Sequence, residues 1–242
     1  MPPSLPPPIL FADRRFAVLD KPPGLPSHPG PRGGASAEDW FPFLSRRRDG
    51  PWLAHRLDAD TAGCLLVALR KQALIEAQRC LGGTDRPGAD GRRAEKRYWA
   101  VVRGRPPGER GTVSRPLHKR SDRTGWRMVA DPGGQEAVTD WRLLGESGDG
   151  AGEPIAWLEL LLRTGRTHQA RVHCATLGCP VLGDGIYGKG NDRGGGDGTG
   201  LHLLARSLML PLDPPVAAVA PPPPHMLAAL ERCGFSPPAG NR

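Results

Sequence analysis

The sequence predicts a single α+β domain built on a mixed, mostly antiparallel sheet. Short apolar runs with strand character outnumber segments with helical spacing, and breaks rich in proline and glycine separate most of these runs. A chain of 242 residues can bury one substantial core or two small ones, and no linker is long enough to force independent domains. We therefore expect one domain over residues 9–235, with a flexible proline-rich leader at 1–8 and a flexible tail at 236–242.

The first part of the chain is organised around a segment that can only be buried, residues 64–69. An apolar run of this length bounded by turn residues is typical of a core strand. Before it, Ser36 and Asp39 form a helix-capping pattern, and Pro42 limits the length of the helix that follows. The elements expected here are strands at 9–11, 16–19 and 64–69 and helices at 36–44 and 71–81, with irregular chain at 21–34.

Strand patterns dominate the rest of the chain. Strands are expected at 96–102, 112–115, 126–130, 136–144 and 155–163, and helices at 168–178 and 225–233. The polar segment from Gly82 to Arg93 and the Gly/Asp-rich segment 190–200 are expected to be loops.

The composition restricts the class of protein. A net charge of +8 suits a polyanionic partner, because lysines and arginines on one face neutralise phosphates; a merely basic soluble protein is the alternative. No apolar run is long enough to span a bilayer, and no secretory signal is visible. Five scattered cysteines do not form a disulfide framework, so reduced thiols and a cytoplasmic location are expected.

Residues 55–63, His-Arg-Leu-Asp-Ala-Asp-Thr-Ala-Gly, place charged side chains directly before the core strand. In an extended segment Arg56, Asp58 and Asp60 lie on the same side, and a carboxylate beside an arginine stays ionised. Such a carboxylate on a rigid mount is a candidate nucleophile or electrostatic stabiliser. A surface arginine–aspartate pair at a strand entry is the alternative, and chemistry alone leaves both open. Asp60 is expected to fix the turn by accepting backbone N–H groups.

Three other patterns carry less weight. Residues 183–189 fit G-x-G-x-x-G and the start of a P-loop, but Gly190 replaces the required Ser or Thr and no helix is expected there. His168, His173, Cys174 and Cys179 lack the spacing of a zinc site, so no metal is expected. A serine hydrolase has no Gly-x-Ser-x-Gly elbow to support it.

The segment 163–173 is basic and lies between an expected strand and an expected helix. Its arginines and backbone N–H groups suit a phosphate, while pairing of an arginine with a core acid is the structural alternative. The two alternatives converge if Arg171 pairs with Asp58, since that contact would hold the carboxylate charged. Tyr98 lies in an alternating strand, where a core tyrosine is the default.

Five stretches resemble, in order, the motifs of the RluA-type pseudouridine synthases. They are Ala-Val-Leu-Asp-Lys-Pro-Pro-Gly-Leu at 17–25, His-Arg-Leu-Asp-x-x-Thr-x-Gly at 55–63, Glu-Lys-Arg-Tyr-x-Ala-x-Val-x-Gly at 95–104, Thr-Gly-Arg-Thr-His-Gln-Ala-Arg-Val-His at 164–173 with Gly-Asp-x-x-Tyr-Gly at 183–188, and Leu-His-Leu-Leu-Ala-x-x-Leu at 201–208. The departures, Ala62, Cys64 and Ala170, fall on flanking packing positions.

The resemblance implies the pseudouridine synthase fold and the isomerisation of uridine to pseudouridine in RNA, without metal or cofactor. Asp58 would be the catalytic aspartate, Tyr98 would stack on the target base, and Arg171 would contact the aspartate. The substrate-binding set implied is His55, Arg56, Tyr98, Arg166, His168 and Arg171. The expected partner is structured RNA, tRNA or large-subunit rRNA, bound by a monomer that lacks the S4-type domain of many relatives. A non-catalytic RNA-binding module is the alternative function.

Overall fold

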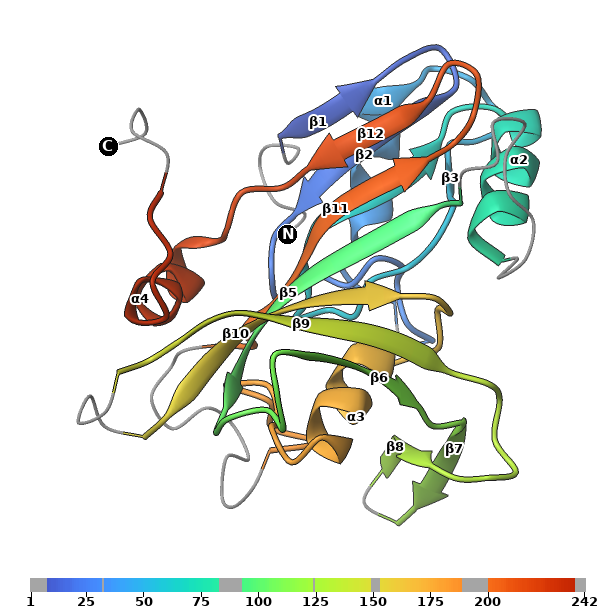
Figure 1. The fold of residues 1–242 in the computed structure, drawn as a ribbon. Helices are drawn as coiled ribbons and strands as arrows, with labels where there is room; N and C mark the ends of the chain where they lie inside the picture. Colours follow the sequence, from blue (N-terminus) through green and yellow to red (C-terminus); the bar gives the residue numbers. More distant parts are fainter. Residues whose placement is uncertain are drawn as a thin grey trace. The chain divides into compact units, whose positions relative to one another are not determined.

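The computed structural model of the chain describes residues 8–31, 33–82, 93–123, 125–148, 153–188 and 200–237 (Figure 1). Its contacts group the chain into two compact units. Unit 1 consists of Met1–Tyr98, Arg163–Gly165 and Leu204–Pro221, and unit 2 consists of Trp99–Leu162, Arg166–Leu203 and Pro222–Arg242.

The strands of unit 1 form a mixed sheet. They are β1 (Ile9–Ala12), β2 (Phe16–Lys21), β3 (Trp52–Leu53), β4 (Ala62–Ala68), β11 (Leu203–Leu210) and β12 (Val216–Val219). Their order is β1-β2-β4-β11, with β12 beside β11 and β3 beside β4. The pairing of β4 with β11 is parallel, and the other pairings within this unit are antiparallel.

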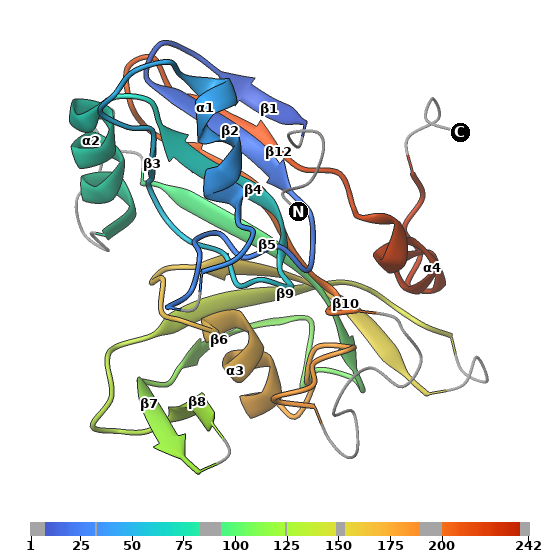
Figure 2. The ribbon, with the colours of Figure 1, turned by 180° about the vertical axis from the view of Figure 1, so that it is seen from behind.

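The central strand of unit 1 is β4, whose seven residues are all buried. Successive side chains of a strand point to opposite faces, so alternate residues share a face. On one face Leu65 and Val67 pack with Leu19 and with Trp40. Trp40 ends the 3-10 helix η1 (Ala37–Trp40), which continues into α1 (Phe41–Leu44); Figure 2 shows α1 in front of the sheet, while α2 (Lys71–Gly82) lies beside β3.

Unit 2 is built on a second set of antiparallel strands. They are the end of β5 (Glu95–Arg103), β6 (Arg110–Ser114), β7 (Leu117–Asp122), β8 (Gly125–Ala130), β9 (Val138–Glu146) and β10 (Ile155–Leu162). Strand β9 pairs with β10 on one side and β6 on the other, and β7 and β8 form a separate hairpin.

The two helices of unit 2 cover different parts of it. Helix α3 (Gln169–Thr176) packs near the hairpin through Val172, which joins Leu117, Met128 and Tyr187 in one apolar cluster. Helix α4 (Pro224–Arg232) is followed by Phe235, whose ring meets the edges of Trp99 and Trp157. The hairpin is thus joined to the start of α3 through the apolar cluster, and that region carries the basic motif 163–173.

The predicted α+β class and its mixed, mostly antiparallel sheet are confirmed, and the predicted capping pattern is present, with Ser36 and Asp39 bonding each other's backbone. Strands β3, β7 and β12 were not predicted. Strand β7 has the sequence Leu-His-Lys-Arg-Ser-Asp with only Leu117 buried, so it shows no apolar alternation and depends on pairing with β8.

Several expectations fall outside what the structure describes. The leader at 1–8, the loop from Gly82 to Arg93, the loop 190–200 and the tail 236–242 lie wholly or largely among undescribed residues. The domain limits 9–235 stay a prediction. Within the described part of the chain, no helix is long and apolar enough to cross a membrane.

Candidate active site and arginine–aspartate network

Within unit 1, hydrogen bonds to odd-numbered residues anchor the loop at 55–61 to the neighbouring segments. The imidazole Nε2 of His55 accepts the N–H of Leu66 at 3.1 Å, which ties the start of the loop to β4. Ser27, which is buried, holds both backbone groups of Leu57: its hydroxyl oxygen accepts the N–H at 2.9 Å and its hydroxyl donates to the carbonyl at 2.8 Å. The path of the loop is therefore set by hydrogen bonds to its main chain.

Lys21 supplies the next anchor. Its ammonium group, with 0% of the residue exposed, donates to the carbonyls of Ala59 (2.8 Å), Pro22 (2.8 Å) and Leu25 (2.7 Å). Burial lowers the pKa of Lys21 to about 8, although the nearby charges of Asp60 and Asp58 act in the opposite direction. A buried cation thus fixes the backbone directly after Asp58 and adds positive potential there.

The two exposed residues of the loop are even-numbered. Arg56 and Asp60 are exposed and Asp58 is partly exposed, as expected for residues on one side of an extended segment. The turn closes when the N–H of Thr61 donates to the carbonyl of Asp58 at 3.1 Å. Among the described residues the structure records no hydrogen bond to the Asp60 carboxylate. The expectation that this side chain fixes the turn is therefore wrong, because a main-chain bond already closes it.

Gly63 ends the motif because no side chain fits there. A Cβ atom at this position would lie 2.4 Å from the carbonyl oxygen of Ala205 and 2.8 Å from a methyl carbon of Leu204, and the residue has φ +104°. Gly63 pairs with Ala205 where β4 meets β11. The glycine lets the two strands approach and seats the loop on the sheet.

Two more side chains of unit 1 belong to this region. The ring of Tyr98 packs against the core cluster, and burial, followed by the charge of Asp58, raises the pKa of its phenol well above the ordinary value. The phenol therefore stays protonated beside Asp58. Burial, with a smaller contribution from Lys96, lowers the pKa of His55 to about 4, so its imidazole is neutral and can accept the Leu66 N–H.

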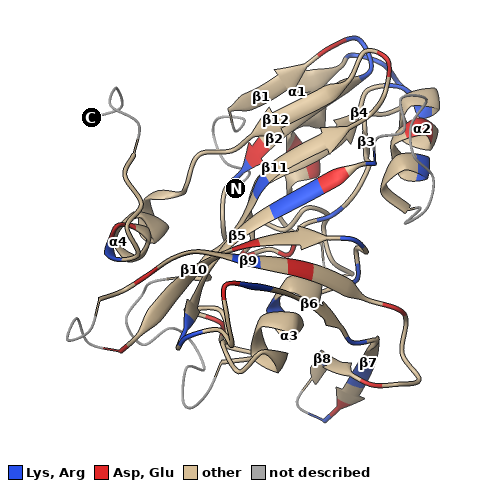
Figure 3. Cartoon of the chain, viewed as in Figure 1, with Lys and Arg blue, Asp and Glu red and all other residues tan. Residues whose placement is uncertain are grey.

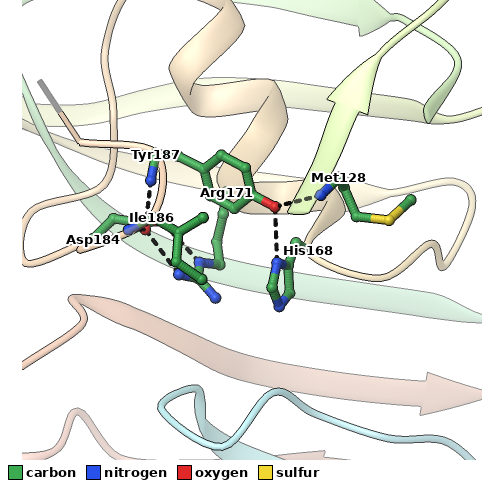
Figure 4. Close-up of polar contacts among 6 residues, drawn as sticks. All are labelled: Met128, His168, Arg171, Asp184, Ile186 and Tyr187. Atoms are coloured by element: carbon green, nitrogen blue, oxygen red, sulfur yellow. Dashed lines mark hydrogen bonds and ion pairs between the residues drawn. The ribbon is translucent and has the colours of Figure 1, made fainter. Parts of the chain in front are cut away.

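In unit 2, the basic motif is organised by a buried ion pair between Arg171 and Asp184 (Figure 4). The guanidinium donates through Nε to Oδ2 and through Nη2 to Oδ1, both at 2.8 Å, and the two side chains are 6% and 0% exposed. Asp184 Oδ1 also accepts the N–H groups of Ile186 at 2.9 Å and Tyr187 at 3.0 Å. These donors lower the pKa of Asp184 even though burial acts to raise it.

Tyr187 connects this pair to His168 and to the hairpin. Its hydroxyl oxygen accepts the N–H of Met128 at 2.9 Å and lies 2.8 Å from Nδ1 of His168 (Figure 4). Which of the two groups donates in the bond between Tyr187 and His168 depends on the tautomer of the imidazole.

His168 precedes α3 with φ 53°, and among the described residues it is the only one other than glycine at positive φ. Such a conformation is costly for a residue with a side chain and is common at functional sites. Gln169 stabilises the turn, since its Oε1 accepts the Arg166 N–H at 3.0 Å while its amide donates to Thr139 Oγ1 at 2.9 Å. Arg166 is exposed and donates through Nε to the Glu136 carbonyl at 2.9 Å.

The structure decides between several of the alternatives. Pairing of an arginine with a core acid is observed, between Arg171 and Asp184; an additional contact of Arg171 with Asp58 stays a prediction, as do the substrate-binding roles of all six residues assigned to that set. The G-x-G-x-x-G segment forms turns in which the Asp184 carboxylate accepts the N–H groups that a phosphate would need, so it is not a nucleotide loop. Across the described residues no cluster of three or more His, Cys, Asp or Glu side chains could hold a metal.

Sequence reasoning did not assign roles to Lys21, Ser27, Asp184 or Tyr187. Lys21 and Asp184 lay inside motifs already recognised at 17–25 and 183–188, which was the available signal. Nothing in the sequence indicates that Ser27 bonds Leu57, thirty residues away.

Comparison with known proteins defines the class of the fold. The solved structure of human RNA pseudouridylate synthase domain containing 4 superimposes with a TM-score of 0.73 at 29% identity, covering 95% of this chain and 94% of that one. The architecture is therefore that of a pseudouridylate synthase domain.

The sequence comparisons give the family. A family model described as RNA pseudouridylate synthase matches residues 15–176. Uncharacterized RNA pseudouridine synthases of Synechocystis sp. and Zymomonas mobilis are 36% identical over 178 and 165 residues, which are 69% and 67% of this chain. The chain belongs to the RNA pseudouridylate synthase family. It spans half the length of the first relative and 69% of the second.

Proposed function

We propose that this protein isomerises uridine to pseudouridine in structured RNA, with Asp58 as the catalytic group. The observation that carries the proposal is the mounting of Asp58: its neighbours on both sides are fixed through their backbone by Ser27 and Lys21, while Asp58 itself is partly exposed. A positioned carboxylate beside a buried cation is suited to attack or deprotonate a bound sugar.

The reaction needs a base that has left its helix. A uridine inside a duplex is out of reach, so the target nucleotide is flipped out of its helix, and Tyr98 stacks on the uracil ring. The buried phenol of Tyr98 is protonated, so the ring brings no second negative charge next to Asp58. Arg56 and the basic segment 163–173 bind the phosphate backbone.

At the ribose, Asp58 attacks C1′ or removes the 2′ proton, and the bond from C1′ to N1 of uracil breaks. The uracil rotates and forms a new bond from C5 to C1′. This step displaces the Asp58 carboxylate if it had attacked C1′, or returns the proton to C2′ if Asp58 had removed it. The proton of C5 leaves to solvent, and N1 gains a proton. The sequence of bond changes is balanced, so it requires no oxidant, metal or cofactor. We propose tRNA or large-subunit rRNA as substrate, with a cytoplasmic monomer as the acting form.

The test uses Asp58→Asn, a neutral isostere. We expect single-turnover release of tritium from RNA transcripts carrying C5-tritiated uridine to fall by at least about 10³-fold, because a positioned catalytic group contributes about 10²–10⁴-fold or more. RNA affinity in filter binding should stay within a few-fold of wild type. An unchanged rate would remove Asp58 from catalysis. A wild-type protein that binds these transcripts but never releases tritium would instead support the non-catalytic RNA-binding module.

A further inference from the structure

The hairpin formed by β7 and β8 is the most strongly basic exposed element that the structure describes in unit 2. Residues 117–130 contain four cations, Lys119, Arg120, Arg123 and Arg127, and one acid, Asp122. All five are exposed, and Figure 3 shows the basic residues along β7 and at its end. An exposed net charge of this sign suits a polyanion.

The register of the hairpin sets Arg120 and Arg127 directly opposite each other. Like charges in directly opposed positions destabilise a strand pair. A bound phosphate would relieve the repulsion between the two guanidinium groups. The outer face of the hairpin is therefore arranged for an anionic ligand.

The opposite face of the hairpin carries an exposed aromatic ring. Toward the base of the hairpin, Leu117 and Met128 pack into the apolar cluster with Val172 and Tyr187. Beyond the packed part, Trp126 lies on the same face with 46% of its surface exposed. Lys119 Nζ lies 4.8 Å from the centre of the indole ring. An exposed tryptophan beside a mobile cation resembles the surfaces on which single-stranded nucleic acids stack.

The imidazole of His168 fixes the orientation of the Trp126 indole ring. The ring stacks on the imidazole of His168, with centroids 5.1 Å apart and planes at 24°. His168 is itself held by Tyr187, whose hydroxyl oxygen also accepts the Met128 amide in β8. Trp126 is therefore tied to the turn that begins α3, rather than free to rotate at the hairpin tip.

We propose that Trp126 is a stacking platform for an unpaired nucleobase of the RNA substrate, with Lys119 on the same face binding the phosphate of that nucleotide and the Arg120–Arg127 pair on the other face binding phosphates further along the strand. The proposal rests on the proposed function, since it names a second point of contact with the same RNA. The approaching base takes the place of Lys119 over the ring, and the lysine moves to the phosphate of that nucleotide. The enzyme would thus favour RNA that presents an unpaired base in addition to the target uridine.

The experiment compares three substitutions of Trp126 in the full chain. Trp126→Phe keeps a π face, Trp126→Leu keeps packing against His168 without a π face, and Trp126→Ala removes both. The probe is a short fluorescein-labelled single-stranded oligouridine, with an RNA duplex of equal length for comparison. We expect the Leu and Ala variants to bind oligouridine about tenfold more weakly and the Phe variant to stay within about threefold, because base–aromatic stacking contributes about that much per base. Duplex binding should change little, since its bases are already stacked.

Phe43→Ala is the matched control, because Phe43 is another exposed aromatic residue, 73% exposed, in unit 1. It should bind oligouridine like wild type. Salt dependence separates stacking from charge: Arg120→Ala and Arg127→Ala should each reduce the slope of log affinity against log salt by about 0.7, whereas Trp126→Leu leaves it unchanged. Near-wild-type thermal melts of the Phe and Leu variants confirm that both are folded.

The proposal is overturned if Trp126→Leu and Trp126→Ala bind oligouridine as tightly as wild type, or if Phe43→Ala weakens binding equally. These outcomes are independent of catalysis. If wild type binds oligouridine through Trp126 but releases no tritium from any transcript, the isomerase assignment fails and the stacking platform stands. If tritium release is normal and the Trp126 variants bind normally, only the platform is rejected.

Discussion

The loop at 55–61 and the network around Arg171 both contain charged side chains. They differ in which groups the hydrogen bonds hold: main-chain groups in the loop, and side chains in the network. In the loop, Ser27 and Lys21 bond to main-chain groups, and the side chains of Arg56 and Asp58 stay accessible. In the network, side chains bond to one another, and Arg171 is almost fully buried by its pair with Asp184.

The difference separates a reacting group from a supporting one. A catalytic side chain needs a rigid backbone together with accessible functional atoms. Asp58 has fixed backbone neighbours and is partly exposed, whereas the side chain of Asp184 is 0% exposed and accepts bonds from Arg171, Ile186 and Tyr187. We therefore interpret the network as the part that holds the turn at His168 in its left-handed conformation, and the loop as the part that reacts.

The largest stability effect should come from breaking the buried pair. Asp184→Asn leaves the guanidinium of Arg171 buried without the countercharge of Asp184, so the free energy of unfolding should fall by about 3–5 kcal/mol. Chemical denaturation measures this change. The paired substitution Arg171→Met with Asp184→Leu removes both charges and should recover a large part of the loss. If Asp184→Asn unfolds at the same denaturant concentration as wild type, the pair does not organise this region.

A smaller loss is expected on the loop side, from Lys21→Met. The substitution leaves the carbonyl groups of Pro22, Leu25 and Ala59 without their donor but also removes a charge that was costly to bury, so the free energy of unfolding should fall by about 3 kcal/mol or less. Tritium release should fall as well, because the carbonyl of Ala59 loses its anchor next to Asp58. Lys71→Met, at an exposed lysine of α2, is the control and should change neither quantity.

The lowered pKa of Lys21 also predicts that the free energy of unfolding depends on pH. The folded pKa of Lys21 is about 8, below its ordinary value of 10.5, so the folded state binds fewer protons between these values. Its stabilising contribution is therefore complete above pH 10.5 and is lost as the pH falls through 8, with a slope of about 1.4 kcal/mol per pH unit at most. Melts at increasing pH should show wild type gaining stability relative to Lys21→Met across this window. A constant difference would mean that the lysine titrates normally.

Local features of the fold and of the candidate site could be predicted from the sequence, whereas long-range contacts could not. Spacing alone predicts that Arg56 and Asp58 share a side, and the apolar run after them predicts β4, because both follow from local geometry. The anchor from Lys21 to Ala59 spans 38 residues, and no local pattern predicts which distant carbonyl groups a lysine will meet.

The partner of Arg171 and the strand β7 show the same limit. Arg171 offered several acids as partners, and its pairing with Asp184 follows from the turn at 183–188, whose amides hold that carboxylate in place. Strand β7 is polar and becomes a strand because β8 pairs with it. Local patterns thus predicted the buried strand β4 and failed where strand pairing or long-range bonding decides.

The smallest effect, and the most discriminating comparison, is that of Asp60→Asn with Asp58→Asn. Both carboxylates lie on the accessible side of the loop and both raise the pKa of Lys21, so charge alone does not distinguish them. Asp60 is exposed, and the turn beside it is closed by the Thr61 amide and the Asp58 carbonyl rather than by its side chain. We therefore expect Asp60→Asn to change the free energy of unfolding by no more than about 0.5 kcal/mol, as for most surface substitutions, and to keep most of the single-turnover rate.

Removing the charge of Asp60 should lower the pKa of Lys21 further, since one of the two carboxylates that favour the ammonium form is gone. Thermal melts and tritium release on both variants decide the assignment: an inactive Asp60→Asn beside an active Asp58→Asn would exchange the two roles and contradict the mounting argument for Asp58.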